Sequence, residues 1–512
     1  MSKKLVALVL FCSAAFSDVC ALEDSEVRKS RAEICNSVVR ISVDAFKFNW
    51  LEPYCAPQES SWTGSGFFIN EDGDFLTNYH IVEQARGIRI QISSIVFQSF
   101  PAEVIGVSPE RDLALMRLTD KARDDIRKIL GAIPFLPFGD SDKVSRGDGI
   151  TLLGYPLGQQ YLKITQGIVS GMGRPKPEDS HSFLRILCFQ TDAAANGGSS
   201  GGCLLNDRGE VLGVLFCGCS EARNIGYTLP INALRNAIEE MREVKISRVM
   251  VPGISVCPCN EDMAIFLGNP EDGGMFINAV AAGSSFEKIG IRKGDVIYEI
   301  NGYKLDFYGA IVVPWSEDKI STLDFFSRSK RGDGVLLTVF RNGVRHKFSF
   351  EIGQSDLFPI RQMYPEYEAI DYEIFGGMVF MNLTLNYIDL AAKHVPELRR
   401  YASIGKRHQP AIVITRIVAT SPAARLDCAV TTGSIVEEVN GEKVKDLDGL
   451  RKALRKSFDT KFVTILADDK RYSVFSVDSI LKDEKRLASI CQYPLSPFVK
   501  ELYDKQPGAA AA

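Results

Sequence analysis

The chain lacks a long apolar run and a large excess of charge of either sign. Its 512 residues contain no apolar stretch of about eighteen residues, the length that a membrane-spanning helix needs. The net charge is −4, so no basic face of the strength that nucleic-acid binding requires is expected. We therefore expect no stable membrane span in the mature chain and no nucleic-acid partner.

What is present is the composition of a globular protein, with 45% hydrophobic and 24% charged residues. A chain of 512 residues is too long for one hydrophobic core, which predicts several domains. Residues 1–21 have the three parts of a secretory signal: Lys3 and Lys4, an apolar run, and Ala21 before the cleavage site. A buried N-terminal helix is the alternative. We expect removal of residues 1–21 and export to the periplasm or out of the cell.

The cysteine pattern permits disulfides but does not favour a metal. Ten of the 12 cysteines follow the signal, an even number for an exported chain. Two pairs, Cys217/Cys219 and Cys257/Cys259, are separated by single residues, whereas structural zinc sites use longer spacings, and no histidine stands near either pair. Loop disulfides or buried thiols are favoured, and we expect neither a metal site nor a cofactor.

Residues 28–245 are predicted to form one β-rich domain. From about residue 37 to residue 244, short β runs alternate with turn residues, which is typical of a barrel or a sandwich. Asp72-Gly73 and Arg208-Gly209 each lie in a tight turn between two such runs. An amphipathic helix starting at Asn232 closes the region, with Leu234 and Ile238 on its apolar face.

The second half of the chain contains one unit twice. The block from residue 275 to 302 recurs more loosely from residue 411 to 441, which predicts two copies of one α+β domain. The first copy is assigned to residues 250–353 and ends in a hairpin at Asn342-Gly343. The second, divergent copy covers residues 354–480, carries an insertion at its start and contains a helix capped by Asp446. Residues 481–512 are expected to form a C-terminal tail.

The first domain contains the groups that serine needs to hydrolyse an amide: a nucleophile, a base, a carboxylate and oxyanion donors. Ser200 lies in the glycine-rich turn of residues 196–202, where the N–H groups of Gly198 and Ser200 would meet the oxyanion. His80 follows an apolar run, and Asp112 precedes another. Each residue taken alone has a plain structural alternative: a flexible loop, a surface histidine or a strand-capping aspartate.

The chain order His80, Asp112, Ser200 is that of chymotrypsin-type barrels and differs from the orders of subtilisin-type and α/β-hydrolase enzymes. Six motifs accompany these residues in sequence. They are Thr63-Gly64-Ser65-Gly66-Phe67-Phe68, Leu76-Thr77-Asn78-Tyr79-His80, Arg111-Asp112-Leu113-Ala114, Leu153-Gly154-Tyr155-Pro156-Leu157-Gly158, Gly167-Ile168-Val169-Ser170, and Thr191-Asp192-Ala193-Ala194 with Ser200-Gly201-Gly202. In this order they resemble the Deg/HtrA family of serine proteases, and the divergent second copy is most similar to the plant-type Deg subgroup.

This resemblance implies a mainly β fold, with a chymotrypsin-like double β-barrel followed by two PDZ-like α+β domains. It also implies an ATP-independent endopeptidase that degrades unfolded proteins and assembles as a homo-oligomer, either a trimer or a multiple of trimers. PDZ domains bind peptide segments or chain ends as an added strand. The alternatives are an inactive chaperone or scaffold with the same fold, and a peptide-binding adaptor. An adaptor would leave the His, Asp and Ser motifs unexplained.

The sequence departs from the family pattern around the nucleophile. Gly197 and Cys203 stand where the family usually has proline, and Ser199 stands where it usually has asparagine. Ser199, one position earlier, and the thiol of Cys203 are therefore alternative candidates for the nucleophile. Ser200, directly before Gly201-Gly202, fits the motif better than either.

Two sets of binding residues complete the predictions. Ala195, Val214, Leu215 and Phe216 are expected to line a substrate pocket without an acid, which favours small or medium apolar side chains at the cleavage site. In the first PDZ copy, the N–H groups of Gly253 and Ile254 are expected to receive a peptide, although a simple connecting loop is equally consistent with this short pattern. In the second copy the candidate is Phe375-Gly376-Gly377-Met378.

Overall fold

A computed structural model describes most of the chain after residue 30, and the predicted signal, Cys219 and Cys428 lie outside the described residues. The described ranges are 31–95, 97–175, 186–218, 225–270, 273–353, 358–425 and 430–504. The chain divides into two compact units. Of the described residues, the first contains 31–45, 60–249 and 310–333, and the second contains 46–59, 250–309 and 334–504, with the gaps given above. Among the described residues, no helix combines the length and the apolar character of a membrane span.

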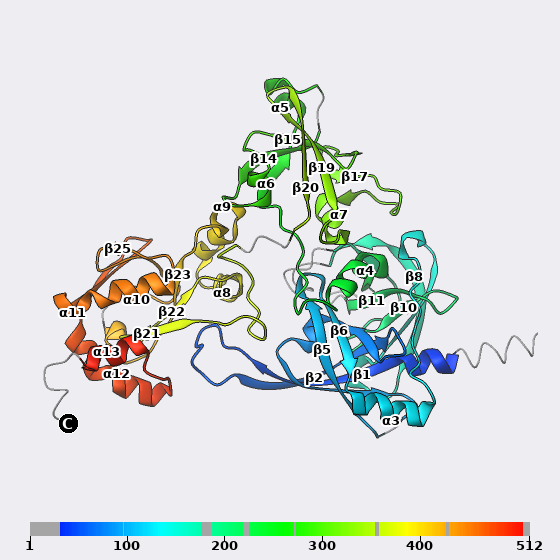
Figure 1. Cartoon of the computed structure of the whole chain (residues 1–512), viewed down its shortest axis with the longest axis horizontal. Coiled ribbons are helices and arrows are strands. Elements are labelled where there is room, and N and C mark those ends of the chain that lie inside the picture. The colour runs from blue at the N-terminus through cyan, green and yellow to red at the C-terminus, as the bar shows by residue number, and fades with distance from the viewer. Residues whose placement is uncertain are drawn as a thin grey trace, which may run out of the picture. The chain divides into compact units, whose positions relative to one another are not determined.

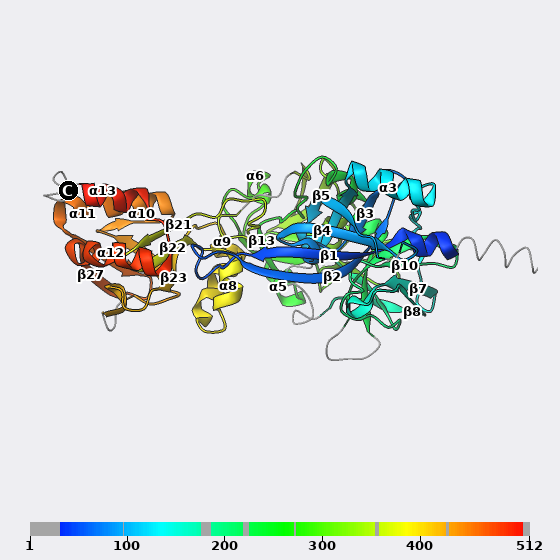
Figure 2. The same cartoon turned by 90° about the horizontal axis from the view of Figure 1, so that it is seen from below.

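The first unit is built around two closed six-stranded barrels, as predicted (Figure 1). In the first barrel the strands follow the order β1 (Val38–Lys47), β2 (Gln58–Phe68), β3 (Asp74–Thr77), β6 (Leu113–Leu118), β5 (Phe100–Ser108) and β4 (Ala85–Ile92). The long strands β1 and β2 run side by side in both views (Figures 1 and 2). Gly73 supplies the positive φ of 83° that the turn between β2 and β3 needs.

The second barrel has the strand order β10 (Cys203–Leu205), β11 (Val211–Gly218), β12 (Gly226–Pro230), β9 (Cys188–Thr191), β8 (Lys163–Gly173) and β7 (Gly149–Gly154). The two barrels share one hydrophobic core. Its buried members include Phe67 and Leu115 from the first barrel and Leu153, Val214 and Leu229 from the second. Because this core fixes the barrels against each other, side chains from both can meet at one site.

Short helices connect and cover the strands of the first unit. They are α2 (Tyr79–Val82), α3 (Asp120–Leu130), α4 (Ile231–Glu240) and α7 (Thr322–Arg328), with 3-10 turns at Pro109–Arg111, Ser141–Lys143 and Pro156–Gly158. Helix α4 buries Leu234 and Ile238 as predicted, but it begins at Ile231 and not at Asn232. Asn232 donates from its side chain to Asp140, whereas Pro230 occupies the capping position. The short strands β17 (Ala310–Ile311) and β18 (Ile320–Ser321) also belong to this unit.

The second unit contains two PDZ-type sheets. The first has the order β13 (Ile254–Pro258), β14 (Met275–Val280), β15 (Val296–Ile300), β19 (Gly334–Arg341), β20 (Val344–Glu351), with β16 (Tyr303–Lys304) beside β15. Helices α5 (Glu261–Phe266) and α6 (Ser285–Lys288) accompany it. Asn342 and Gly343 both have positive φ, which confirms the predicted hairpin.

The second sheet begins with an added strand. Its order is β21 (Tyr372–Phe375), β22 (Met378–Asn382), β23 (Ile412–Ile417), β24 (Ile435–Val439), β26 (Phe462–Ala467), β27 (Tyr472–Ser476), with β25 (Glu442–Lys443) beside β24. The helices are α8 (Leu385–Ala391), α9 (Ile404–Arg407), α10 (Leu447–Arg455), α11 (Ser457–Thr460), α12 (Val477–Cys491) and α13 (Pro497–Asp504), with a 3-10 turn at Pro396–Ala402. Asp446 caps α10 as predicted. Residues 481–504, which the sequence suggested as a tail, contribute Phe498 and Leu502 to the same core.

Candidate active site

The carboxylate of Asp112 holds the ring and the backbone of His80 together. Its Oδ2 lies 2.7 Å from Nδ1 of the His80 ring, and its Oδ1 accepts the His80 backbone N–H at 2.8 Å. Asp112 itself has a left-handed backbone with φ 48° at the end of a 3-10 turn, and Asn78 Nδ2 donates to its carbonyl. Asp112 is buried, so this pair meets little competing water. The ring of His80 is thereby fixed in orientation.

The negative charge of Asp112 also raises the pKa of His80. Burial by itself lowers the pKa of His80, because it disfavours the imidazolium. The negative charge and the hydrogen bond of Asp112 outweigh burial, and the net pKa of His80 lies above its ordinary value. This is the electrostatic condition for an imidazole that accepts a proton and is stabilised once it is charged.

Ser200 lies at the same place, in the turn before β10. Its side chain is nearly buried, and its Oγ donates to the carbonyl of Phe216 at 2.9 Å. The ring of Phe216 faces the ring of His80 edge-on, with 6.2 Å between the centroids. Phe216 therefore borders both the imidazole and the hydroxyl. In the described structure His80 and Asp112 are in direct contact, and His80 and Ser200 both contact Phe216.

The turn around Ser200 is held by three backbone hydrogen bonds. Ser199 N–H donates to Asn196, Gly201 N–H to Leu215, and Gly202 N–H to Ser199. Gly198 has a φ of 89°, which favours glycine. None of these bonds uses the N–H groups of Gly198 and Ser200. Those two donors are the ones that the sequence assigned to an oxyanion hole.

The rival nucleophiles are placed less favourably. Ser199 is buried, and its Cα and Cβ pack within 3.3 Å of where a side chain on Gly154 would lie. Cys203 is fully buried in the core, and burial raises the pKa of its thiol far above the ordinary value. A thiol in such surroundings is inert, because only the thiolate is a good nucleophile.

Ser65 was not singled out from the sequence, although it lies in the first of the six motifs. Its Oγ donates to the carbonyl of Gly198 and accepts the N–H of Tyr155, both at 2.8 Å. Its own N–H donates to the carbonyl of Ser200 at 2.9 Å. Ser65 thus ties the serine turn to β2 and to the segment after β7. Only the fold brings these three segments together, so no pattern in the sequence pointed to this role.

The four predicted pocket residues do not share one face of the barrel. Val214 and Phe216 belong to the core between the barrels, whereas Leu215 and Ala195 pack in the interior of the second barrel. This division follows from the alternation of side chains along β11. Ala195 Cβ lies 3.1 Å from where a side chain on Gly226 would begin, so Gly226 leaves space beside it.

The two candidate peptide-binding turns of the PDZ copies differ in how many of their backbone groups already form hydrogen bonds. Gly253 has a φ of 74° in the turn before β13, and β13 pairs with β14 alone among the described strands. In the second copy the N–H of Gly376 donates to the buried carboxylate of Glu484 at 2.9 Å. Strand β22 is paired on both sides, with β21 and with β23. Among the described strands, the strand that follows the turn is therefore an edge strand only in the first copy.

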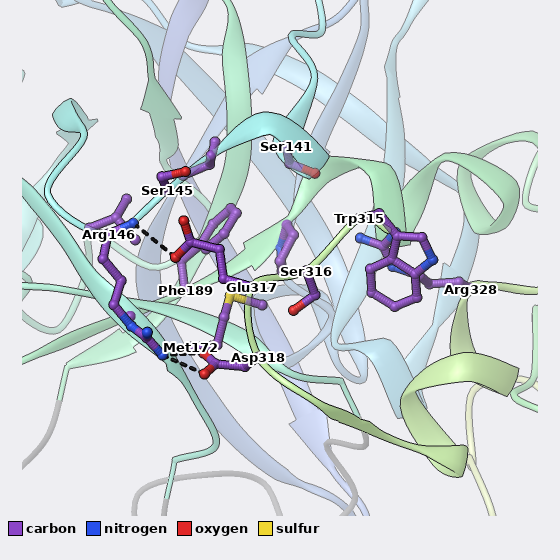
Figure 3. Close-up of a pocket in the computed structure, with 14 residues that line it drawn as sticks. Ser141, Ser145, Arg146, Met172, Phe189, Trp315, Ser316, Glu317, Asp318 and Arg328 are labelled. Atoms are coloured by element: carbon purple, nitrogen blue, oxygen red, sulfur yellow. Dashed lines mark hydrogen bonds and ion pairs between the residues drawn. The ribbon is translucent and has the colours of Figure 1, made fainter. Parts of the chain in front are cut away.

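A separate pocket lies on the second barrel, against residues 310–333 (Figure 3). Arg146 reaches Asp318 there, and its backbone N–H lies 3.5 Å from Glu317. The guanidinium of Arg328 stacks on the ring of Trp315 at 3.7 Å. Neither His80 nor Ser200 lines this pocket. Within the described ranges, no three His, Cys, Asp or Glu side chains gather as they would around a metal ion.

Comparisons with known proteins agree with this architecture. Residues 64–214 match the family described as a trypsin-like peptidase domain, and residues 363–492 match the PDZ domain family. A protein of a Marinomonas species, described as a probable periplasmic serine endoprotease, DegP-like, is 31% identical over 335 residues, which is 63% of this chain and 67% of that protein. A protein of the same description from Chlamydia trachomatis is 27% identical over 408 residues, covering 78% of this chain and 71% of the relative.

A mitochondrial Do-like protease 12 of Arabidopsis thaliana is 28% identical over 439 residues, with 85% of this chain and 81% of the relative covered. Among solved structures, the HtrA-type protease AlgW with a decapeptide is similar at a TM-score of 0.49 and 21% identity, over 64% of this chain and 98% of that one.

Two closed barrels, an Asp–His pair and a serine in a glycine-rich turn define a serine protease of the chymotrypsin-like class, here joined to PDZ domains. The chain belongs to the Deg/HtrA family of DegP-like serine endoproteases.

Proposed function

We propose that this protease cuts unfolded or misfolded polypeptides without ATP in an exported compartment, with His80, Asp112 and Ser200 as its catalytic residues. The observation that carries the proposal is the double contact of Asp112 with the ring and backbone of His80, at 2.7 and 2.8 Å, beside the Ser200 turn. The bacterial relatives described as periplasmic support export.

In the proposed reaction the hydroxyl of Ser200 leaves the Phe216 carbonyl and turns to the imidazole of His80. Its Oγ attacks the substrate carbonyl while His80 takes the proton, and the Asp112 carboxylate stabilises the imidazolium. The N–H groups of Gly198 and Ser200 stabilise the oxyanion. His80 then gives its proton to the leaving amine, and water hydrolyses the acyl-enzyme by the same steps.

We further propose that Ala195, Val214, Leu215 and Phe216 shape a site for small or medium apolar side chains, and that Gly253 and Ile254 receive a peptide along β13. The free edge of β13 supports the second of these assignments. A homo-oligomer, either a trimer or a multiple of trimers, is proposed from the family resemblance. Preferential cutting after Lys or Arg would contradict the proposed pocket.

The decisive experiment compares casein cleavage by the wild type and by Ser200→Ala, with Ser199→Ala as the matched control. Loss of the nucleophile is expected to reduce kcat by about 10⁶-fold, whereas Ser199→Ala should retain most activity. A wild type without activity would leave the chaperone or scaffold hypothesis, and a Ser200→Ala variant as active as the wild type would exclude Ser200 as the nucleophile. The mass in solution with and without casein tests the proposed assembly.

A further inference from the structure

The direction of each oxyanion donor is set by the carbonyl of the preceding residue. In a trans peptide the C=O of one residue and the N–H of the next point in opposite directions. The Ser199 carbonyl accepts the N–H of Gly202 at 2.9 Å, which turns the N–H of Ser200 the other way. The Gly197 carbonyl accepts the N–H of Leu157 at 2.5 Å, which turns the N–H of Gly198 away from Leu157. The first bond lies within the serine turn, whereas the second comes from a different segment.

Leu157 makes this second bond from an unusual backbone conformation. Its φ of 55° and ψ of 26° place it in the left-handed region, inside the 3-10 turn of residues 156–158. Leucine seldom adopts this conformation, because its Cβ approaches its own carbonyl oxygen. Its side chain is 74% exposed, so packing of the side chain does not account for the conformation. Backbone strain of this kind collects at functional sites, where the surrounding structure holds it in place.

The two segments fit closely around this bond. A Cβ on Gly198 would lie 2.7 Å from the Tyr155 carbonyl oxygen and 3.0 Å from the Leu157 nitrogen. Ser65 Oγ bonds both the N–H of Tyr155 and the carbonyl of Gly198, each at 2.8 Å. A Cβ on Gly197, in contrast, would meet no atom within 4 Å. Packing therefore restrains Gly198 but not Gly197, and the Leu157 N–H holds the carbonyl oxygen of the peptide that joins them.

On the basis of the proposed roles of Gly198 and Ser200, we propose that Leu157 is a positioning residue for peptide hydrolysis. Its left-handed backbone presents the N–H that fixes the Gly197 carbonyl and thereby aims the Gly198 N–H at the oxyanion. If Leu157 relaxes to negative φ, its N–H leaves Gly197. The Gly197–Gly198 peptide can then turn over and bring a carbonyl oxygen to the place of the donor.

Because the Leu157 side chain is exposed, substitutions there change mainly the backbone preference. Asparagine adopts positive φ several-fold more readily than other non-glycine residues, a β-branched valine resists it, and proline excludes it and has no N–H. We expect Leu157→Asn to keep kcat within about twofold and Leu157→Val to lower it by about tenfold. Leu157→Pro should lower kcat by about 10²–10³-fold, the loss that follows removal of one oxyanion donor. The KM of a fluorogenic peptide should change by less than about threefold in all variants.

A pair of inhibitors separates positioning from general damage. A peptide aldehyde forms a tetrahedral adduct with the serine and places an oxygen in the oxyanion site, whereas the corresponding peptide alcohol binds without an adduct. The affinity for the aldehyde should fall in parallel with kcat/KM across the series, and the affinity for the alcohol should stay constant. Ile129→Val, at an apolar residue of α3 that is 50% exposed, is the matched surface control and should match the wild type.

Each outcome decides between the two proposals. If Leu157→Val and Leu157→Pro keep the wild-type kcat and aldehyde affinity, or if aldehyde and alcohol weaken equally, the positioning role is wrong while the proposed function stands. If Ser200→Ala keeps full activity, the proposed function itself fails. Leu157→Val carries the test if thermal melting shows that Leu157→Pro does not fold.

Discussion

At the scale of single residues, Asp112 controls both the tautomer and the charge of His80. One of its oxygens faces the ring Nδ1 at 2.7 Å, and the other accepts the His80 N–H. An amide in place of this carboxylate can still occupy the site, but it cannot supply the charge, and its NH₂ group can favour the wrong tautomer. Replacing Asp112 by asparagine therefore removes the negative charge beside His80 and keeps nearly the same side-chain shape.

For Asp112→Asn we expect a loss of about 10⁴-fold in kcat with an unchanged fold. The wild type should lose kcat/KM as the pH falls through the raised pKa of His80, because the protonated imidazole cannot act as a base. In Asp112→Asn this acid limb should move to lower pH, since the charge that raises the pKa is gone. Rates on a fluorogenic peptide from pH 5 to 9 measure both effects. An acid limb that stays in place would contradict the pairing.

The buried carboxyl group of Glu484 should make the stability of the second PDZ-type domain depend on pH. Burial raises its pKa to about 7, although bonds from Tyr493 and Gly376 oppose this. The folded state then holds a proton that the unfolded chain releases near its ordinary pKa. The stabilisation is complete below about pH 4 and falls by about 3 kcal/mol as the pH rises through 7.

Glu484→Gln should remove this slope, because its amide oxygen can accept the Gly376 N–H and its NH₂ can donate to Tyr493. The control is Asp483→Asn, at the next residue, which pairs with Arg425 and Arg486 and has a lowered pKa. That substitution should leave the slope between pH 5 and 8 as it is. Calorimetric melting of the full chain at several pH values makes the comparison. Equal slopes in wild type and Glu484→Gln would refute the assignment.

At the scale of elements, the two PDZ copies differ in whether the strand after the candidate peptide-binding turn has an unpaired edge. Strand β13 has one partner, β14, whereas β22 lies between β21 and β23, and the Gly376 N–H is taken by Glu484. A peptide that adds as a strand needs a free edge and free N–H groups in the turn. We therefore expect peptide binding at the first copy and none at the second.

Two glycines give a matched test of this difference. A Cβ on Gly253 would lie 2.5 Å from Ser284 Cβ, and one on Gly377 would lie 2.1 Å from Ser421 Cβ, both at positive φ. Alanine should thus distort each turn to a similar degree. Affinity for a labelled peptide with a free, apolar C-terminus, measured by fluorescence polarisation, should fall by at least about tenfold in Gly253→Ala and stay unchanged in Gly377→Ala. The reverse pattern would assign the site to the second copy.

Elements also show what the sequence could predict. The turn at Gly73 and the hairpin at Asn342-Gly343 followed from local signals, and so did the helix capped by Asp446, because their geometry depends on neighbouring residues. The family motifs gave the double barrel. The Leu157–Gly197 bond and the occupation of the Gly376 N–H by Glu484 join segments that are far apart in sequence, and no periodicity reports such contacts. For the same reason the boundary at residue 480 missed that α12 and α13 pack in the second PDZ core.

At the scale of the whole molecule, a protease whose first PDZ copy binds peptide ends, as proposed, would have two contacts available for one long substrate. A bound chain end raises the effective concentration of the rest of that chain at the catalytic site. We expect kcat/KM for an unfolded protein such as reduced casein to exceed that for a decapeptide with the same cleavage sequence by about 10²-fold. Gly253→Ala should remove most of this advantage and leave cleavage of the decapeptide unchanged, because Ser200 and His80 are untouched. Gly377→Ala serves as the control and should retain it. An equal preference for casein in Gly253→Ala and wild type would mean that the first PDZ copy does not deliver substrate to the barrels.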